Sequence, residues 1–240
     1  MHVTPFFFIM NDLIQYLSQF ATERRFQLMT EIAAQRTRYL TVVLEDIYQP
    51  HNASAVLRTC DCLGIQDVHI IEKKNRYTLN PDVELGSAQW LTLYKHNQTD
   101  SPAKEAISAL RSRGYRIVAT TPHVRDVSPD DFDLLNGPAA IVFGTEMRGI
   151  TTEILDLADD FIRIPMAGFT ESYNISVSAA IILYTLSQKL RKSAIDWKLA
   201  SEESDLLILE WLRKSVKHSD QLEKRYIFDN QKKDPCQSNP

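Results

Sequence analysis

The sequence predicts an α/β protein built on a parallel β-sheet, with helical extensions at both ends of the chain. Between residues 39 and 190, short apolar runs alternate with segments of helical periodicity, a pattern typical of strands covered by helices on both faces. Outside this region, apolar residues recur every three to four positions among many charges, which indicates amphipathic helices. We therefore expect an N-terminal helical arm over 1–38, a central domain over 39–190, and a C-terminal helical extension with a disordered tail over 191–240.

The composition is that of an ordinary globular protein, with 44% hydrophobic and 24% charged residues among 240. No apolar run approaches the roughly 18 residues that cross a bilayer, and no basic segment precedes the short apolar start. The three cysteines lack zinc or thioredoxin-type spacing, and the six histidines lack metal-ligand spacing. These features favour a cytoplasmic protein with reduced thiols and no metal.

The net charge of −4 counts mildly against a nucleic-acid partner, because such domains often have a pI above about 9. Several basic clusters nevertheless exist, among them Lys73 and Lys74 with Arg76. Each cluster alone favours a solvated face. Together they permit a phosphate-binding surface.

The first half of the chain predicts a helical arm followed by a β-α-β unit. Helical periodicity covers residues 11–37, with a break near Ala21 and Thr22. A strand over 39–44, a helix over 53–62 ended by Gly64, and a strand over 68–71 follow within 33 residues. Such a unit favours parallel strands and a right-handed crossover. Residues 86–90 predict a turn or short helix before a strand at about 90–94.

The second half continues the alternation of strands and helices. We expect a helix over 102–114, strands over 116–121 and 139–143, and a loop over 131–135. A short helix capped by Thr151 or Thr152 should run to 157, before a strand over 161–164 and a helix from Ile175 capped by Ser172 or Asn174. An amphipathic helix over 205–216 and a disordered segment over 229–240 complete the prediction.

Three strand-to-helix loops carry unusual polar residues, at 45–58, 144–149 and 165–174. Ligands of parallel sheets bind at the carboxyl ends of strands, so we expect these loops to form one site. Its candidate residues are Asn52, Arg58, Glu146, Ser172 and Asn174. Arg58 lies in an otherwise apolar stretch of helix, where a buried guanidinium needs an anion. Glu146 and a substrate phosphate are equally plausible partners.

The sequence lacks the signatures of several common nucleotide-binding and catalytic sites, which disfavours those functions. No G-x-G-x-x-G follows the first strand, and the Gly144–Gly149 segment lacks the lysine and hydroxyl residue of a nucleotide triphosphatase loop. Ser172 lacks the G-x-S-x-G context of a nucleophile elbow.

Three blocks of the sequence resemble motifs 1, 2 and 3 of the SpoU (TrmH) branch of the SPOUT RNA methyltransferases. They are Glu45–Gly64 (EDIYQPHNASAVLRTCDCLG), Ile141–Ile150 (IVFGTEMRGI) and Ile164–Ala180 (IPMAGFTESYNISVSAA), in the order and spacing of that family. The resemblance covers roughly residues 38–190. Within the family, the sequence is most similar to the tRNA guanosine-2′-O-methyltransferases.

The resemblance implies a SPOUT-type α/β knot, in which the chain after Phe143 forms a deep C-terminal trefoil. It implies a homodimer through the knot region and binding of S-adenosylmethionine, without a metal. The cofactor-binding positions would be Thr120, Phe143, Gly144, Ile164, Met166, Tyr173 and Asn174. The family usually has leucine at position 173.

The implied reaction is methyl transfer to a ribose 2′-hydroxyl of tRNA, at a D-loop guanosine. Arg58 would hold the adjacent phosphate and stabilise negative charge on the oxygen, with Glu146 orienting it and Asn52, Ser172 and Asn174 positioning the ribose. Arg24, Arg25, Arg36 and Arg38 would contact the RNA backbone. The alternatives are an rRNA 2′-O-methyltransferase of the same family, a non-catalytic RNA-binding member, and a small-molecule α/β enzyme.

Overall fold

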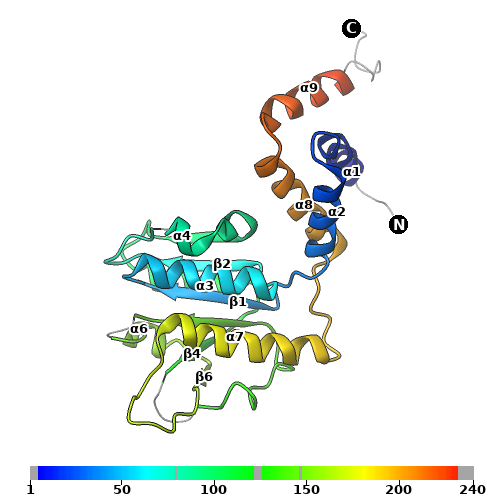
Figure 1. Ribbon diagram of the computed structural model, residues 1–240. Coiled ribbons are helices and arrows are strands. Elements are labelled where there is room, and N and C mark those ends of the chain that lie inside the picture. Colours follow the sequence, from blue (N-terminus) through cyan, green and yellow to red (C-terminus); the bar gives the residue numbers. More distant parts are fainter. Residues whose placement is uncertain (1–4, 79, 122–125, 146–147, 232–240) are drawn as a thin grey trace. The chain divides into compact units, whose positions relative to one another are not determined.

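The structure is a computed structural model that describes residues 5–78, 80–121, 126–145 and 148–231 (Figure 1). The chain folds into two compact units, which we describe separately. One unit comprises Thr37–Lys198 and contains the sheet. The other combines the chain up to Arg36 with the chain from Leu199 onward, so the N-terminal and C-terminal helices belong to one unit.

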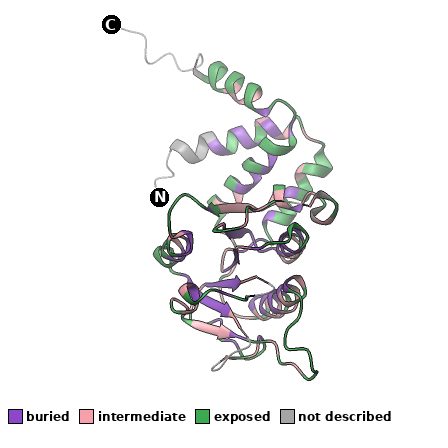
Figure 2. Ribbon diagram, turned by 90° about the vertical axis from the view of Figure 1, so that its left-hand side faces the viewer, coloured by how far each residue is buried: buried purple, intermediate pink, exposed green. Residues whose placement is uncertain are grey.

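The unit over Thr37–Lys198 is built on a six-stranded sheet of order β3-β2-β1-β5-β4-β6, in which every pairing is parallel. The strands are β1 (Leu40–Glu45), β2 (Asp67–Ile71), β3 (Thr92–His96), β4 (Arg116–Thr120), β5 (Ala139–Phe143) and β6 (Asp160–Ile162). All residues of β1, β2 and β5 are buried (Figure 2). The predicted parallel α/β sheet is confirmed.

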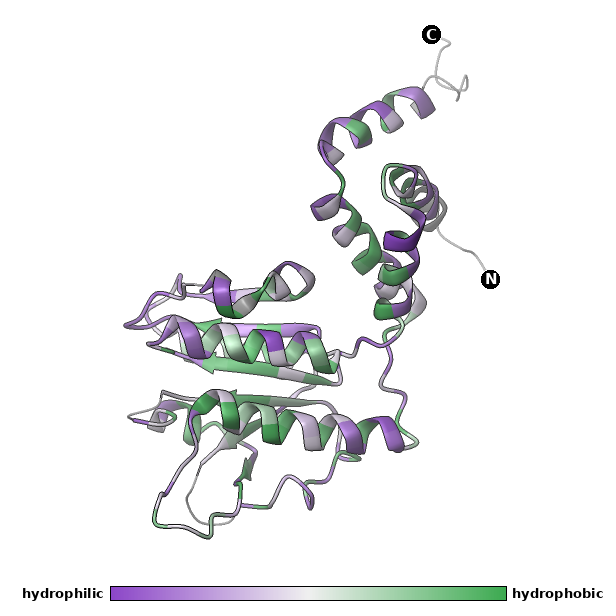
Figure 3. Cartoon of the chain, viewed as in Figure 1, coloured by the Kyte–Doolittle hydropathy of each residue, from purple (hydrophilic) through white to green (hydrophobic). Residues whose placement is uncertain are grey.

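Helices cover both faces of this sheet. One face packs against α3 (Pro50–Leu63) and α7 (Ile175–Lys192), which lie side by side in Figure 1. The other face packs against α5 (Pro102–Ser112) and α6 (Thr152–Leu155). Burial on both faces explains why the central strands are almost continuously apolar (Figure 3). Two short elements, α4 (Pro81–Glu84) and η1 (Ser87–Trp90), precede β3.

The strand order reverses between β1 and β5, which are neighbours in the sheet although β2, β3 and β4 lie between them in the sequence. At such a point, the loops that leave the two strands diverge to opposite sides and open a crevice at the carboxyl edge. The segments that follow β1 and β5 contain Asn52 and Gly144 respectively. The sheet topology therefore places two of the three candidate loops beside each other.

The second unit is a small helical assembly of α1 (Pro5–Ser18), α2 (Glu23–Ala33), α8 (Ser201–Ser215) and α9 (Ser219–Gln231). Helix α1 contacts α8 and α9, and α2 contacts α8. Its core includes Leu17, Met29, Trp211 and Leu212, all nearly inaccessible. None of the described helices is both long enough and apolar enough to span a membrane.

Most predicted elements are confirmed, including the helix break near Ala21, where Thr22 caps α2 by accepting a hydrogen bond from the Arg25 amide. Gly64 ends α3 in the left-handed conformation, as predicted. Several predicted bounds are wrong, and α1 and α8 begin earlier than expected, at Pro5 and Ser201. Helix α3 begins at Pro50, whose ring suits a first turn, and residues 229–231 continue α9 instead of being disordered. Residues 232–240 lie outside the described part of the chain.

Candidate active site

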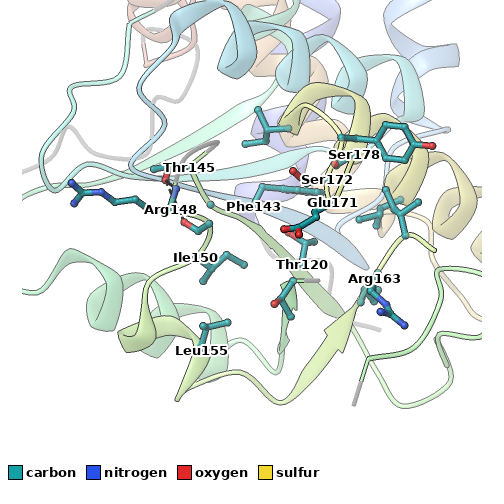
Figure 4. Close-up of a pocket in the computed structure, with 18 of the residues that line it drawn as sticks. Thr120, Phe143, Thr145, Arg148, Ile150, Leu155, Arg163, Glu171, Ser172 and Ser178 are labelled. Atoms are coloured by element: carbon teal, nitrogen blue, oxygen red, sulfur yellow. Dashed lines mark hydrogen bonds between the residues drawn. The ribbon is translucent and has the colours of Figure 1, made fainter. Parts of the chain in front are cut away.

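A cavity of about 540 Å³ lies at the carboxyl ends of β4, β5 and β6. Thr120 and Phe143 line it from the strand ends, and Ile175, Ser178 and Ile182 line it from α7. Figure 4 shows Thr120, Ile150 and Leu155 on its walls, with Arg148 and Arg163 on opposite sides. Glu171, Ser172 and Tyr173 border it from the loop before α7. The loops 144–149 and 165–174 therefore meet at one site, as predicted.

The backbone of the β5 loop folds tightly back on itself at the wall of this cavity. Thr145 and Gly149 exchange backbone hydrogen bonds of 3.0 and 2.9 Å. A Cβ atom added to Gly144 would lie 2.3 Å from the carbonyl carbon and oxygen of Gly149 and 2.4 Å from the amide nitrogen of Ile150. No side chain can occupy position 144 without moving this backbone. A glycine is required there by close approach.

An amide pair links the segment after β1 with the start of α7. The Nδ2 atom of Asn174 donates to Oδ1 of Asn52 at 3.2 Å, and Asn52 is buried. The Oδ1 atom of Asn174 accepts from the amide of Ser176 at 2.8 Å and caps α7, as predicted. The Asn174 side chain thus caps α7 and also holds Asn52. This contact joins the predicted loop 45–58 to the loop 165–174, which borders the cavity.

A buried carboxylate ties the strand β1 to the loop before α6. The oxygens of Glu45 accept from the backbone amide of Thr151 at 2.9 Å and from its hydroxyl at 2.5 Å. Burial raises the pKa of Glu45, and the two hydrogen bonds from Thr151 partly oppose that rise. Because Ile150 and Thr152 line the cavity, this contact anchors its wall to the sheet.

Arg58 lies on a different surface from the cavity. It lines an open groove of about 610 Å³ between α3 and α7, together with Thr59, Cys62, Ala180 and Tyr184 among others. Its side chain is exposed and pairs with no acidic group in the described part of the chain. The expectation of a desolvated guanidinium inside the β1 loop site is therefore wrong. Within one chain, the groove that contains Arg58 and the cavity lie on different faces of α7.

The predicted cofactor positions are almost all brought together. Six of them line the cavity: Thr120, Phe143, Gly144, Ile164, Met166 and Tyr173. Asn174 caps α7 beside it. Of the predicted catalytic residues, Ser172 lines the cavity, Asn52 contacts Asn174, and Glu146 lies outside the described residues.

The four arginines predicted to contact RNA have different environments. Arg24 and Arg25 on α2 are exposed. Arg36 is 1% exposed and its guanidinium lies 5.3 Å from the centre of the Trp211 ring. Arg38 bonds the fully buried Asp67 through Nε at 3.1 Å. Burial corrects the prediction for Arg36, since a side chain in the core cannot contact a phosphate on the surface.

Sequence reasoning missed several residues that line the cavity, notably Arg148, Arg163 and Glu171. Arg148 is exposed, and Nε of Arg163 lies 3.3 Å from Oδ2 of Asp126. Arg148 and Glu171 belong to the polar loops 144–149 and 165–174, which the sequence predicted to form the site. Their position in these loops was therefore the signal that could have identified them as cavity residues. In the described part of the chain, no cluster of three or more His, Cys, Asp or Glu side chains is arranged to hold a metal ion.

Comparison with known proteins gives a consistent result. The model of the SpoU rRNA Methylase family matches residues 39–184. A tRNA (guanosine(18)-2′-O)-methyltransferase of Borreliella burgdorferi is 48% identical, with 85% of this chain and 92% of that protein covered. The Thermus thermophilus protein of the same name is 36% identical, with 80% and 98% covered.

A solved structure supports the same relationship. The Aquifex aeolicus TrmH/SpoU tRNA modifying enzyme superposes with a TM-score of 0.72 at 29% identity, covering 81% of this chain and 98% of that one. The match extends beyond the residues that the family model covers. This chain belongs to the SpoU methylase family.

Proposed function

We propose that the protein transfers a methyl group from S-adenosylmethionine to the ribose 2′-hydroxyl of guanosine 18 in tRNA. The observation that carries this proposal is the cavity at the carboxyl ends of β4, β5 and β6, where Gly144 leaves the backbone bare and Asn174 holds Asn52. The curated relatives at 48% and 36% identity, which bear that activity in their names, supply the substrate.

The cavity fits such a cofactor in size and chemistry. Its volume of about 540 Å³ lies within the range of small-molecule sites, about 300–1,000 Å³. Ile150, Ile164 and Leu155 provide apolar walls for a nucleobase, and Thr120 and Thr145 provide hydroxyls. Bare backbone at Gly144 allows direct hydrogen bonds from the ligand to main-chain groups. S-adenosylmethionine would supply an electrophilic methyl group on a sulfonium.

The chain must then position a weakly acidic hydroxyl for in-line attack. Fixing the geometry can contribute about 7–11 kcal/mol to lowering the barrier. Ser172, which lines the cavity, and Asn52, which Asn174 holds, would bond the ribose. Arg58 would hold the neighbouring phosphate by its planar fork and stabilise the charge that develops on the 2′-oxygen. A guanidinium keeps its proton at neutral pH and is therefore a poor base, so this role is electrostatic.

We propose that Arg58 performs this role at the cavity of a second subunit. Helix α7 lines the cavity with Ile175, Ser178 and Ile182, and lines the groove that contains Arg58 with Ala180, Ile181, Tyr184 and Thr185. A second copy bound at the groove would bury Tyr184, which is 58% exposed. The exposed Arg58 of the first copy would then face the cavity of the second copy. The same assembly would form a homodimer through α3 and α7. The loops after β5 and before α7 would form the trefoil knot.

Arg24 and Arg25 on α2 would bind the RNA backbone, and the reaction would take place in the cytoplasm. If these arginines contact phosphates, their replacement by alanine should weaken tRNA binding and flatten its dependence on salt. Unchanged affinity across a salt series would reject that role.

Transfer of a tritiated methyl group to unmodified tRNA transcripts tests the proposed function. Label should appear on a transcript with guanosine at position 18 and not on one with a 2′-deoxyguanosine there. Ribosomal RNA should remain unlabelled. Label on ribosomal RNA alone would assign the protein to the other substrate of its family, and label on neither would reject the activity.

Subunit complementation tests whether Arg58 acts on the partner's cavity. Arg58→Ala removes the arginine, and a cavity variant such as Gly144→Ala removes the methyl-donor site. If the two groups act across subunits, a mixed dimer contains one complete site and should regain activity that neither homodimer has. If they act within one chain, the mixed dimer contains no complete site and should stay inactive.

A further inference from the structure

A basic loop that follows β2 is not used by the proposed reaction. It contains Lys73, Lys74 and Arg76, all exposed. Lys73 bonds Glu153 through Nζ at 3.1 Å. Lys74 and Arg76 form no ion pair with an acidic group in the described part of the chain. In a protein of net charge −4, these two neighbouring cations leave a local positive charge at the surface.

The loop is held in one conformation by Asp46. The Oδ1 atom of Asp46 accepts backbone hydrogen bonds from Lys73 at 3.1 Å, Lys74 at 2.7 Å and Asn75 at 2.8 Å. The side chain of Asn75 donates to the carbonyl of Asp46 at 2.9 Å. Asp46 itself has a φ of +51°, a conformation that costs energy for most residues and that Asp and Asn tolerate best. These hydrogen bonds fix the backbone conformation at the basic end of the loop.

The other end of the loop is also fixed. Glu72 accepts a hydrogen bond from the amide of Tyr77 at 2.7 Å through Oε1. The carboxylates of Asp46 and Glu72 thus hold the backbone of residues 73–77 by accepting hydrogen bonds from its amides. Among the described residues, neither Asp46 nor Glu72 forms an ion pair with Lys74 or Arg76.

Two contacts join this loop to the wall of the cavity. Lys73 bonds Glu153, which follows the cavity residue Thr152 on α6. Asp46 follows Glu45, which bonds Thr151. The basic loop and the cavity wall are therefore held by neighbouring residues at the end of β1 and at the start of α6, and both lie at the carboxyl edge of the sheet. Arg148, exposed and on the cavity rim, extends toward one side of the site in Figure 4.

We infer that Lys74 and Arg76 bind phosphates of the RNA strand whose ribose enters the cavity, and that Asp46 positions the loop for this contact. The inference rests on the proposed function, since it requires an RNA substrate. Phosphate contacts by lysine and arginine set the register of a nucleic acid without reading its sequence. A preformed loop avoids the entropic cost of ordering the backbone that carries two long side chains when RNA binds.

Binding of unmodified tRNA to the full-length protein, measured over about 50 to 300 mM salt, tests the phosphate contacts. Lys74→Ala with Arg76→Ala should weaken binding about tenfold and reduce the slope of log affinity against log salt by about 1 per lost contact. Affinity for S-adenosylmethionine should not change. Lys192→Ala is the matched control, because this exposed lysine ends α7, about 25 Å along the helix from Ile175.

Two Asp46 variants separate positioning from folding. Asp46→Asn retains an acceptor oxygen and tolerates the positive φ, so tRNA affinity should stay within about twofold of the wild type. Asp46→Ala loses all three hydrogen bonds to the loop, and tRNA affinity should fall toward that of the Lys74 and Arg76 variant. Affinity for S-adenosylmethionine reports whether the adjacent cavity is intact in both variants.

The outcomes distinguish this inference from the function on which it rests. If the wild type methylates tRNA but the Lys74 and Arg76 variant binds tRNA with unchanged affinity and salt slope, the phosphate surface is wrong and the function stands. If the wild type neither binds nor methylates tRNA, both fail. If Asp46→Asn binds as weakly as Asp46→Ala, the positioning role of the Asp46 acceptor oxygen is overturned.

Discussion

Helix α7 lies between the cavity at the strand ends and the groove beside α3, and these two sites are built differently. The cavity at the strand ends is walled by backbone and by loops tied together through Glu45, Asn52 and Asn174. The groove between α3 and α7 is a shallow helix surface with exposed Tyr184 and Arg58. The described residues of one chain enclose the cavity, whereas the groove presents apolar and cationic side chains at the surface. The proposed chemistry uses both, which is the physical argument for the proposed second subunit.

The largest effect should come from altering the cavity. Gly144→Ala places a Cβ 2.3 Å from the backbone of Gly149, so the loop that walls the cavity must move. We expect loss of detectable S-adenosylmethionine binding by calorimetry and loss of methyl transfer. The cause is steric, since Gly144 is not among the glycines of positive φ.

Gly168→Ala is the control for this variant. A Cβ at Gly168 meets nothing nearer than the amide of Thr170 at 4.0 Å, although the residue belongs to the neighbouring loop of the same site. Cofactor affinity close to that of the wild type is expected. Equal losses in the two variants would mean that loop flexibility, and not the close approach at Gly144, governs binding.

Replacing Arg58 in the groove should separate catalysis from cofactor binding. Arg58→Ala should lower the rate of methyl transfer by about 10² to 10⁴-fold, the range for losing one electrostatic or proton-handling group. S-adenosylmethionine affinity should remain unchanged because Arg58 does not line the cavity. Arg58→Lys keeps the charge and loses the planar fork, so it should recover little rate. Wild-type rates for Arg58→Lys would show that the fork is unnecessary.

The sequence predicted the parallel sheet and the meeting of the polar loops because these depend on local patterns and on a general rule of sheet topology. Continuous apolar runs such as Ala139–Phe143 are readable as buried strands. Loops that follow parallel strands emerge at one edge, so the order of strands and loops along the chain was enough to assign Gly144 and Ser172 to one site.

The positions of Arg58 and Arg36 could not be predicted in the same way. The neighbours of Arg58 at positions 55–57 suggested an apolar environment, but a helix turns about 100° per residue, so adjacent residues point in different directions. Arg36 follows α2 in a basic run, and only the fold shows that its guanidinium packs on Trp211 from a helix 175 positions later in the chain. Contacts between elements distant in sequence are invisible to local pattern analysis.

A histidine pair that lines neither the cavity nor the groove tests whether pH acts on the fold or on the site. His69 is 2% exposed and its Nδ1 lies 3.0 Å from Nε2 of His96. Burial, with smaller contributions from His96 and Arg113, lowers the pKa of His69 to about 3. Below about pH 6.5 the unfolded chain binds a proton at this residue while the folded chain does not, so stability falls as pH falls.

The expected loss is about 2 kcal/mol at pH 5 relative to neutral pH. Urea unfolding at both pH values should show this extra loss in the wild type and not in His69→Gln. His51→Gln, at an exposed position, should behave as the wild type. An identical pH dependence in the wild type and His69→Gln would show that His69 is not held neutral in the fold.

The smallest effect expected concerns Asn174, the side chain that belongs to both the fold and the site. Asn174→Asp keeps the oxygen that caps α7, and the new carboxylate at a helix N-terminus is favourable. It cannot donate to Oδ1 of Asn52, so the free energy of unfolding should hold while methyl transfer falls. Asn174→Ala loses the cap as well, which should lower the free energy of unfolding by about 1 kcal/mol. Urea unfolding and initial rates measured on both variants check this separation. Equal stability losses in the two variants would mean that the bond to Asn52, and not the cap, is what Asn174 contributes to folding.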